Sequence, residues 1–420
     1  MKKNGIVFLL ALLAVACEGP QRATSINQAY LYNKNMTRLH PAFNIYHLND
    51  TESQLDFLID ASELLYMKSG KDSIPRSSIY ISVILHAKYD SKEILDSAST
   101  KLTDISDGKN DKFIHGEMKF KASYPNTYSL QVTVADMNRK VNYKSFLTVD
   151  KSNRFNAQNF RIFSDDGREY FGAECGMKDK ILVTSNNPSV QKYIVSYYRS
   201  KIHLPAPPFS MKYMPPVFDY KPDSVFSISA SADAARSFKK QGLYLFRTDS
   251  SQHEGITLRR FYDGYPDVTN EDVLVNALRY ITNKEEFNKM HSSANKKEAV
   301  DKFWLDLSGN EDRAKELISK YYNRVQDANR YFTSYTEGWR TDRGMVYLIF
   351  GPPTTILKSG TLETWYYGEK NNARVLSYTF ALENNRFTDN DFQLRRDPAH
   401  KAAWYKAVET WRQGRMYSNE

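Results

Sequence analysis

In EGWRTDRGMVYLIFGPP, residues 337–353, a tryptophan, two arginines and two carboxylates precede a short apolar run. An aspartate side chain accepts hydrogen bonds from backbone donors two residues on, and glycine adopts turn conformations closed to other residues. Asp342 and Gly344 therefore predict a tight turn that leads into a strand over residues 345–350. The Gly-Pro-Pro at residues 351–353 ends that strand, because proline cannot donate to a β-ladder.

Two interpretations of this stretch are open. In the structural one, the Trp339 ring packs against its own domain, and Arg340 or Arg343 pairs with Asp342 or Glu337. In the functional one, Asp342 and Glu337 form an acid/base pair, as carboxylates do when their surroundings separate their pKa values. Carboxylates that are close in a turn are usually just solvated, and no catalytic nucleophile is evident. We therefore favour the structural interpretation.

The surrounding sequence predicts an α+β domain over residues 266–420. Polar capping residues and helical runs begin near Thr269, and Thr282 and Glu285 stand at the spacing of a capping box. Strand-like runs follow the motif, and a helix with Trp404 and Trp411 on one face closes the region. All the tryptophans of the chain fall after residue 300, which indicates a separate core. A longer helix carries an apolar stripe formed by Leu317, Tyr321, Val325, Ala328 and Phe332.

The preceding residues predict two β-rich regions, so the fold class is a multidomain chain, all-β and then α+β. Residues 51–155 alternate apolar and polar side chains in several short runs, as in Ile79, Ile81 and Val83, which favours an immunoglobulin-like sandwich. Residues 156–265 form a second β-rich domain, with a hairpin signal at Asp166-Gly167. Its proline-rich segment, residues 204–222, is a peptide-like ligand or, as we favour, an extended connector across a domain surface.

The motif Gly338-Trp339-Arg340-Thr341-Asp342 resembles the signature of the GWxTD domain family. The resemblance extends to YYNRVQDANRYF before it and to DRGMVYLIFGPP and ETWYY after it, and covers roughly residues 270–420. It implies an envelope protein of the Bacteroidota type, with a lipid anchor and a β-rich N-terminal part. It implies no particular reaction or ligand.

The first residues, MKKNGIVFLLALLAVACEGP, predict membrane anchoring. Two lysines, an apolar run too short to span a bilayer and a small residue before Cys17 resemble a bacterial lipoprotein signal. We expect residues 1–17 to hold this signal, Cys17 to be acylated, and residues 18–50 to be a polar tether. Ordinary secretion with an incidental cysteine is the alternative. Because residues 18–28 lack an acidic run, we expect a lipid-anchored outer-membrane protein that faces the periplasm.

The composition excludes several classes of function. The formal net charge is +9, but Lys and Arg are dispersed, so we expect no nucleic-acid partner. Two cysteines give no disulfide framework, and Cys175 is expected to be a small buried hydrophobe. None of the eight histidines has metal-ligand spacing, and nucleotide-binding and serine-hydrolase motifs are missing. We therefore expect no metal and no cofactor.

These observations favour a non-enzymatic, lipid-anchored envelope protein that serves as an interaction or scaffold component of an outer-membrane or secretion assembly. The alternative is a glycan- or peptidoglycan-acting hydrolase that uses Asp342 and Glu337. A third hypothesis is glycan binding by Trp365, Tyr366 and Tyr367. The candidate interface consists of Gly338, Trp339, Arg340, Thr341, Asp342, Arg343, Gly344, Gly351, Pro352 and Pro353.

Overall fold

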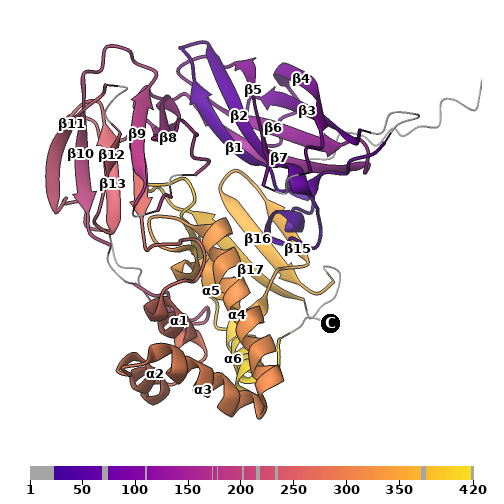
Figure 1. Cartoon of the computed structure of the whole chain (residues 1–420), viewed down its shortest axis with the longest axis vertical. Coiled ribbons are helices and arrows are strands. Elements are labelled where there is room, and N and C mark those ends of the chain that lie inside the picture. Colours follow the sequence, from indigo (N-terminus) through magenta and orange to yellow (C-terminus); the bar gives the residue numbers. More distant parts are fainter. Residues whose placement is uncertain are drawn as a thin grey trace, which may run out of the picture.

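The computed structural model describes residues 23–68, 74–108, 111–172, 174–176, 178–200, 203–213, 218–231, 235–369 and 375–417. The predicted signal and Cys17 lie outside these residues. Within them, no helix has the length and apolar character needed to cross a membrane. The described chain forms five antiparallel sheets and a helical region, arranged as two β-rich parts beside an α+β part (Figure 1).

The first β-rich part is a sandwich of two antiparallel sheets. One sheet has the order β1 (Ala42–His47), β2 (Glu52–Asp60), β5 (Phe113–Lys121). The other has the order β4 (Ile94–Ile105), β3 (Arg76–His86), β6 (Thr127–Asp136), β7 (Val141–Asp150). Every second side chain of β3 faces a core that both sheets share. The two sheets with one core confirm the predicted all-β sandwich. The alternating burial of β3 is that of a strand with one buried face.

Residues 18–50 do not form the expected tether where the structure describes them. The turns η1 (Ala23–Ser25) and η2 (Ala29–Tyr32) precede β1, which pairs with β2. In Figure 1 these indigo turns lie between the sandwich and the hairpin of β15 (Thr355–Lys358) and β16 (Leu362–Tyr367). We call residues 24–36 the strap. Polarity suggested a solvated segment, but Ala29 and Tyr32 are buried in the core of the α+β part.

The second β-rich part also contains two sheets that share a core. Their orders are β12 (Arg236–Ser237), β9 (Lys180–Ser185), β8 (Phe160–Ser164) and β11 (Ser224–Ser229), β10 (Lys192–Tyr198), β13 (Gly242–Arg247), β14 (Ile256–Arg260). The predicted hairpin at Asp166-Gly167 is present, with Gly167 at φ +83°.

The described part of the proline-rich segment crosses the surface of the α+β part. The Pro208 carbonyl accepts a hydrogen bond from the Asp397 N–H at 3.1 Å. The rings of Phe209 and Tyr405 lie 5.4 Å apart between centroids. These contacts fit the connector interpretation.

The α+β part packs helices against a four-stranded sheet. The helices are α1 (Glu271–Ala277), α2 (Lys284–His291), α3 (Lys296–Ser308), α4 (Glu311–Phe332), α5 (Asp342–Phe350) and α6 (His400–Arg412). The sheet order is β15 (Thr355–Lys358), β16 (Leu362–Tyr367), β17 (Leu376–Leu382), β18 (Phe392–Leu394). All the tryptophans are buried, and the predicted apolar stripe of α4 faces this core. The remaining short turns are η3 (Ala61–Glu63), η4 (Ala157–Asn159), η5 (Leu278–Tyr280) and η6 (Gly338–Arg340).

Two predictions of secondary-structure elements and their caps in this part are wrong. The capping box of α2 is formed by Asn283 and Glu286, one residue beyond the expected Thr282 and Glu285. The expected strand over residues 345–350 is the helix α5, whose nine residues are all buried. A short apolar run fits a buried strand and a buried helix equally well, and the surrounding packing decides between them.

Candidate functional site

The GWxTD-like motif lies inside the protein, between α4 and α5. Its 3-10 turn η6 runs directly into α5, and both contact α4. The charged residues of the motif are buried as well, and Arg343 is only 1% exposed. The other buried residues of the motif are Glu337, Gly338, Trp339, Arg340, Thr341, Asp342 and Gly344.

Two glycines of the motif are required by close backbone approach. A Cβ on Gly338 would lie 2.0 Å from the Ala328 carbonyl oxygen of α4. A Cβ on Gly344 would lie 2.0 Å from the Gly338 carbonyl oxygen. Gly344 is part of a regular helix, so the predicted turn conformation at this position is wrong. Its missing side chain lets η6 lie directly on α5.

Trp339 anchors the motif in the core. Its indole Nε1 donates to Glu337 Oε2 at 2.7 Å, and its backbone N–H donates to the side chain of Asn329 on α4. The Arg340 guanidinium lies over the Trp339 ring and places Nε 2.7 Å from Glu337 Oε2. Burial raises the pKa of Glu337, and Arg340 opposes that change. The expected pairing of Arg340 with Glu337 is thus present.

Thr341 and Asp342 connect the start of α5 to strand β18. The Thr341 hydroxyl caps α5 by accepting from the Gly344 N–H at 3.0 Å. Asp342 accepts from the Leu394 N–H at 2.8 Å and pairs with Arg396 at 2.5 Å. The predicted local turn bond of Asp342 is therefore wrong. Of the alternative pairings with a motif arginine, the one present is that of Arg340 with Glu337. Burial raises the pKa of Asp342, against the attraction of Arg396.

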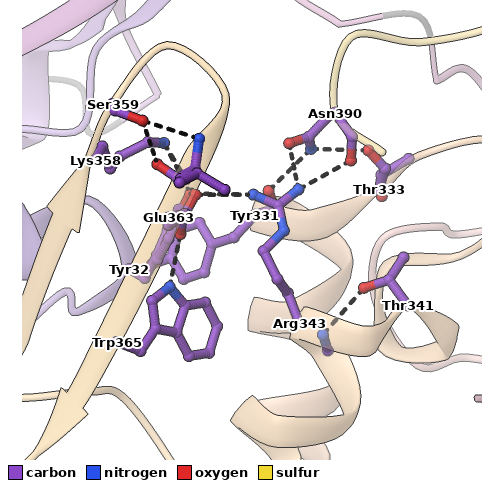
Figure 2. Close-up of polar contacts among 12 residues, drawn as sticks. Tyr32, Tyr331, Thr333, Thr341, Arg343, Lys358, Ser359, Glu363, Trp365 and Asn390 are labelled. Atoms are coloured by element: carbon purple, nitrogen blue, oxygen red, sulfur yellow. Dashed lines mark hydrogen bonds and ion pairs between the residues drawn. The ribbon is translucent and has the colours of Figure 1, made fainter. Parts of the chain in front are cut away.

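Arg343 is the centre of a second buried cluster, drawn in Figure 2. Its Nη1 lies 3.2 Å from Glu363 Oε2, and its Nη2 donates to the Asn390 backbone carbonyl at 2.9 Å. The Asn390 side chain in turn donates to the Thr333 carbonyl at 2.9 Å. The guanidinium carbon Cζ lies over the Phe392 ring, 4.2 Å from its centroid. Arg343 therefore connects α5 to β16, to the loop before β18 and to the end of α4.

Glu363 of β16 is fully buried and has four partners in this cluster. Besides Arg343, Lys358 lies 3.3 Å away, and the Tyr32 hydroxyl donates to the carboxylate at 3.2 Å. Trp365 Nε1 donates to the other carboxylate oxygen at 2.6 Å. Burial disfavours the charge, yet Lys358 and Arg343 hold the pKa of Glu363 below its usual value.

The strap is built into this cluster through Tyr32. Tyr347 of α5 donates its hydroxyl proton to the Tyr32 carbonyl at 2.9 Å, and the Tyr32 ring lies against Phe332 and Trp365. Gln28 adds a backbone bond to the edge strand β15, from its N–H to the Ile356 carbonyl at 2.8 Å. The segment that follows the predicted anchor site is thus part of the same core as the motif.

The Gly-Pro-Pro sequence ends α5 rather than a strand. Gly351 has φ +80°, and its N–H donates to the Tyr347 carbonyl. Arg324 of α4 covers the helix end, with Nη1 bonds to the Leu348 and Ile349 carbonyls at 3.0 and 3.2 Å. Pro352 and Pro353 follow directly after the helix, and α5 cannot continue through them because proline does not fit the helix interior.

The other predicted residues lie elsewhere. Trp365 and Tyr367 face the core of the α+β part and only Tyr366 is partly exposed, so the three rings do not form one sugar platform. Cys175 is half-buried beside the core of the second β-rich part, and burial raises its pKa to about 12. Among the described residues, no group of three His, Cys, Asp or Glu side chains could hold a metal.

Sequence reasoning did not find Tyr32, Lys358, Asn390 or Arg396. Glu363 did carry a signal, because it shares the inward face of β16 with Trp365 and Tyr367 in the alternation. A carboxylate on the core face of a strand predicts a buried cationic partner.

The fold and the motif define a multidomain protein in which β-sandwich regions precede an α+β part organised around a buried Gly-Trp-Arg-Thr-Asp sequence. The family model of the GWxTD domain matches residues 242–413. The chain therefore contains a GWxTD domain, as its motif indicated. The match begins at β13 and so includes the β13–β14 hairpin. No curated protein matches the chain.

Proposed function

We propose that this is a lipid-anchored envelope protein that acts, without catalysis, as an interaction or scaffold component of an outer-membrane or secretion assembly, on the periplasmic side. One observation carries the non-catalytic part of the proposal: the charged side chains of the motif are buried and engaged with partners inside the fold. Arg340 pairs with Glu337, Asp342 with Arg396, and Arg343 with Glu363.

Such contacts suit a structural role better than catalysis. A catalytic carboxylate has to reach a substrate, whereas Glu337 and Asp342 are both nearly covered and already accept hydrogen bonds. Removing one partner of a buried pair leaves an uncompensated charge, so loss of any one of these residues should destabilise the fold.

The strap supports the anchored part of the proposal. From Thr24 on, the residues that follow a lipidated Cys17 would be docked against the sandwich and the GWxTD domain. A domain held close to its anchor keeps a fixed orientation, which favours assembly with membrane proteins.

Affinity purification of the tagged protein from its own envelope tests the proposal, with Cys17→Ser as the unlipidated control. The expected result is a reproducible set of envelope proteins, identified by mass spectrometry and lost or reduced for Cys17→Ser, together with fatty-acid labelling of the wild type. Repeated recovery of this protein alone, after crosslinking and in several detergents, would contradict the scaffold role.

The hydrolase alternative has one observation in its favour, since raised carboxylate pKa values are typical of catalytic acids. Asp342→Asn separates the two functions. A hydrolase that uses Asp342 loses turnover on peptidoglycan fragments while its stability is retained. The structural role predicts a loss of about 3 kcal/mol in unfolding free energy, because the buried Arg396 is left unpaired.

A further inference from the structure

Two exposed apolar side chains stand together at the start of β4. Ile94 and Leu95 are 58% and 43% exposed. They follow the β3–β4 turn, whose residues Lys88 and Lys92 are also exposed. Scattered exposed apolar residues are ordinary, but two neighbours at one tip form a small apolar patch.

A β-bulge produces this arrangement. His86 pairs with Ile94 and Leu85 pairs with Asp96, so Leu95 is an extra residue without a partner across the ladder. In a regular strand, consecutive side chains point to opposite faces, whereas a bulge redirects one of them. The bulge therefore leaves both side chains at the tip exposed.

The strap begins at the same tip. The Thr24 N–H donates to Asp90 Oδ1 at 2.9 Å, and the Gln28 side chain donates to the Tyr89 hydroxyl at 3.1 Å. A chain spans at most about 3.5 Å per residue, so the six residues from Cys17 to Ala23 reach about 20 Å. Acyl chains on Cys17 would thus hold the bilayer surface within about 20 Å of this tip.

We propose that the β3–β4 tip is a membrane-contact surface, with Ile94 and Leu95 inserted at the boundary between lipid headgroups and acyl chains. This inference rests on the proposed lipidation of Cys17. Two side chains are too few to bind a bilayer alone, but a lipid anchor raises their effective concentration at the surface.

Charge does not drive this contact. Three lysines near the tip are balanced by three carboxylates, and two of the carboxylates are engaged with Thr24 and with the Lys121 N–H. The contact should therefore form on zwitterionic phosphatidylcholine as well as on vesicles that contain phosphatidylglycerol. The six groups are Lys88, Lys92, Lys121, Asp90, Glu93 and Asp96.

A fluorescent label at Ile94→Cys tests the proposal in the lipidated full chain. Cys175→Ala removes the other thiol, and acylation blocks Cys17. Ile105→Cys is the matched control, because Ile105 is also exposed but ends the same strand, roughly 37 Å away at about 3.4 Å per residue. An environment-sensitive dye is attached, and phosphatidylcholine vesicles carry spin-labelled lipids as quenchers.

The expected result is a blue shift, a severalfold rise in intensity and quenching by the spin-labelled lipids at position 94, with no change at position 105. Flotation of the same samples reports anchoring independently. Protein that floats while the label at position 94 stays in water overturns the membrane contact alone. Protein that does not float overturns both the lipid anchor and the inference that depends on it.

Discussion

Substitution of Gly344 by alanine tests whether the motif is a packing requirement, because two effects predict opposite signs. In a helix interior, alanine is more favourable than glycine by about 1 kcal/mol. At Gly344, however, the added Cβ would lie 2.0 Å from the Gly338 carbonyl oxygen and 2.8 Å from the Trp339 Cα. Real Cβ contacts stay beyond 3.0 Å, so η6 and α5 must move apart by about 1 Å or more.

The close contact outweighs the helix propensity. Forcing an extra carbon into a packed core costs about 1–3 kcal/mol. Separating η6 from α5 also weakens the bond from the Thr341 hydroxyl to the Gly338 carbonyl, which is 2.7 Å long in the native fold and contributes about 1 kcal/mol. After the gain from propensity is subtracted, Gly344→Ala should lower the unfolding free energy by about 1–3 kcal/mol.

Urea unfolding followed by tryptophan fluorescence measures this change, because every tryptophan lies in the α+β part. Ser319→Ala is the control: Ser319 is exposed on α4, and its substitution should change stability by less than about 0.5 kcal/mol. If Gly344→Ala proved as stable as the wild type, the packing argument would be refuted. The glycine would then need a functional explanation.

Three further substitutions test the buried clusters and the strap. Glu363→Gln should lower the unfolding free energy by about 3–5 kcal/mol, because Arg343 loses its buried ion-pair partner. Because the folded pKa of Glu363 is lowered, the advantage of the wild type should shrink as pH falls through that pKa in acid urea titrations. Glu337→Gln should behave oppositely: its folded pKa is raised, so the wild type loses advantage as pH rises through it in the same titrations. Tyr32→Ala should lower the unfolding free energy by about 3 kcal/mol and let trypsin cleave the strap at Lys34. Met36→Ala is the control, because Met36 is exposed and its substitution should change neither stability nor cleavage. Unchanged digestion of Tyr32→Ala would contradict strap docking.

Long periodic segments were predictable because burial itself sets their period. Ile79, Ile81 and Val83 alternate in β3 since one face of the sheet is covered. Tyr321 and Phe332 recur on the buried face of α4 because that helix packs against the domain core. In both cases the polarity of each side chain indicates whether it is buried, so the pattern can be interpreted without knowing a distant partner.

The motif could not be predicted in the same way. The apolar residues of α5 have no period, because the helix is buried all round. Thr341 as a capping residue and Asp342 in the first turn were the local signals for a helix. The partners that fix the charges, Glu363 and Arg396, lie 20 and 54 residues beyond Arg343 and Asp342 respectively, so no local pattern contains them.

The partners outside the motif explain why such a short sequence organises a whole domain. Asn329 of α4 holds the Trp339 backbone, Arg396 after β18 neutralises Asp342, and Glu363 of β16 neutralises Arg343. Each contact joins the η6–α5 segment to a different element, so the motif has its buried charges compensated only when helix and sheet are both in place. Tyr32 extends this dependence to the strap, because it shares the Glu363 carboxylate with Arg343. Strap docking and motif assembly are therefore coupled, and a force or partner that displaces the strap weakens the same cluster that holds α5.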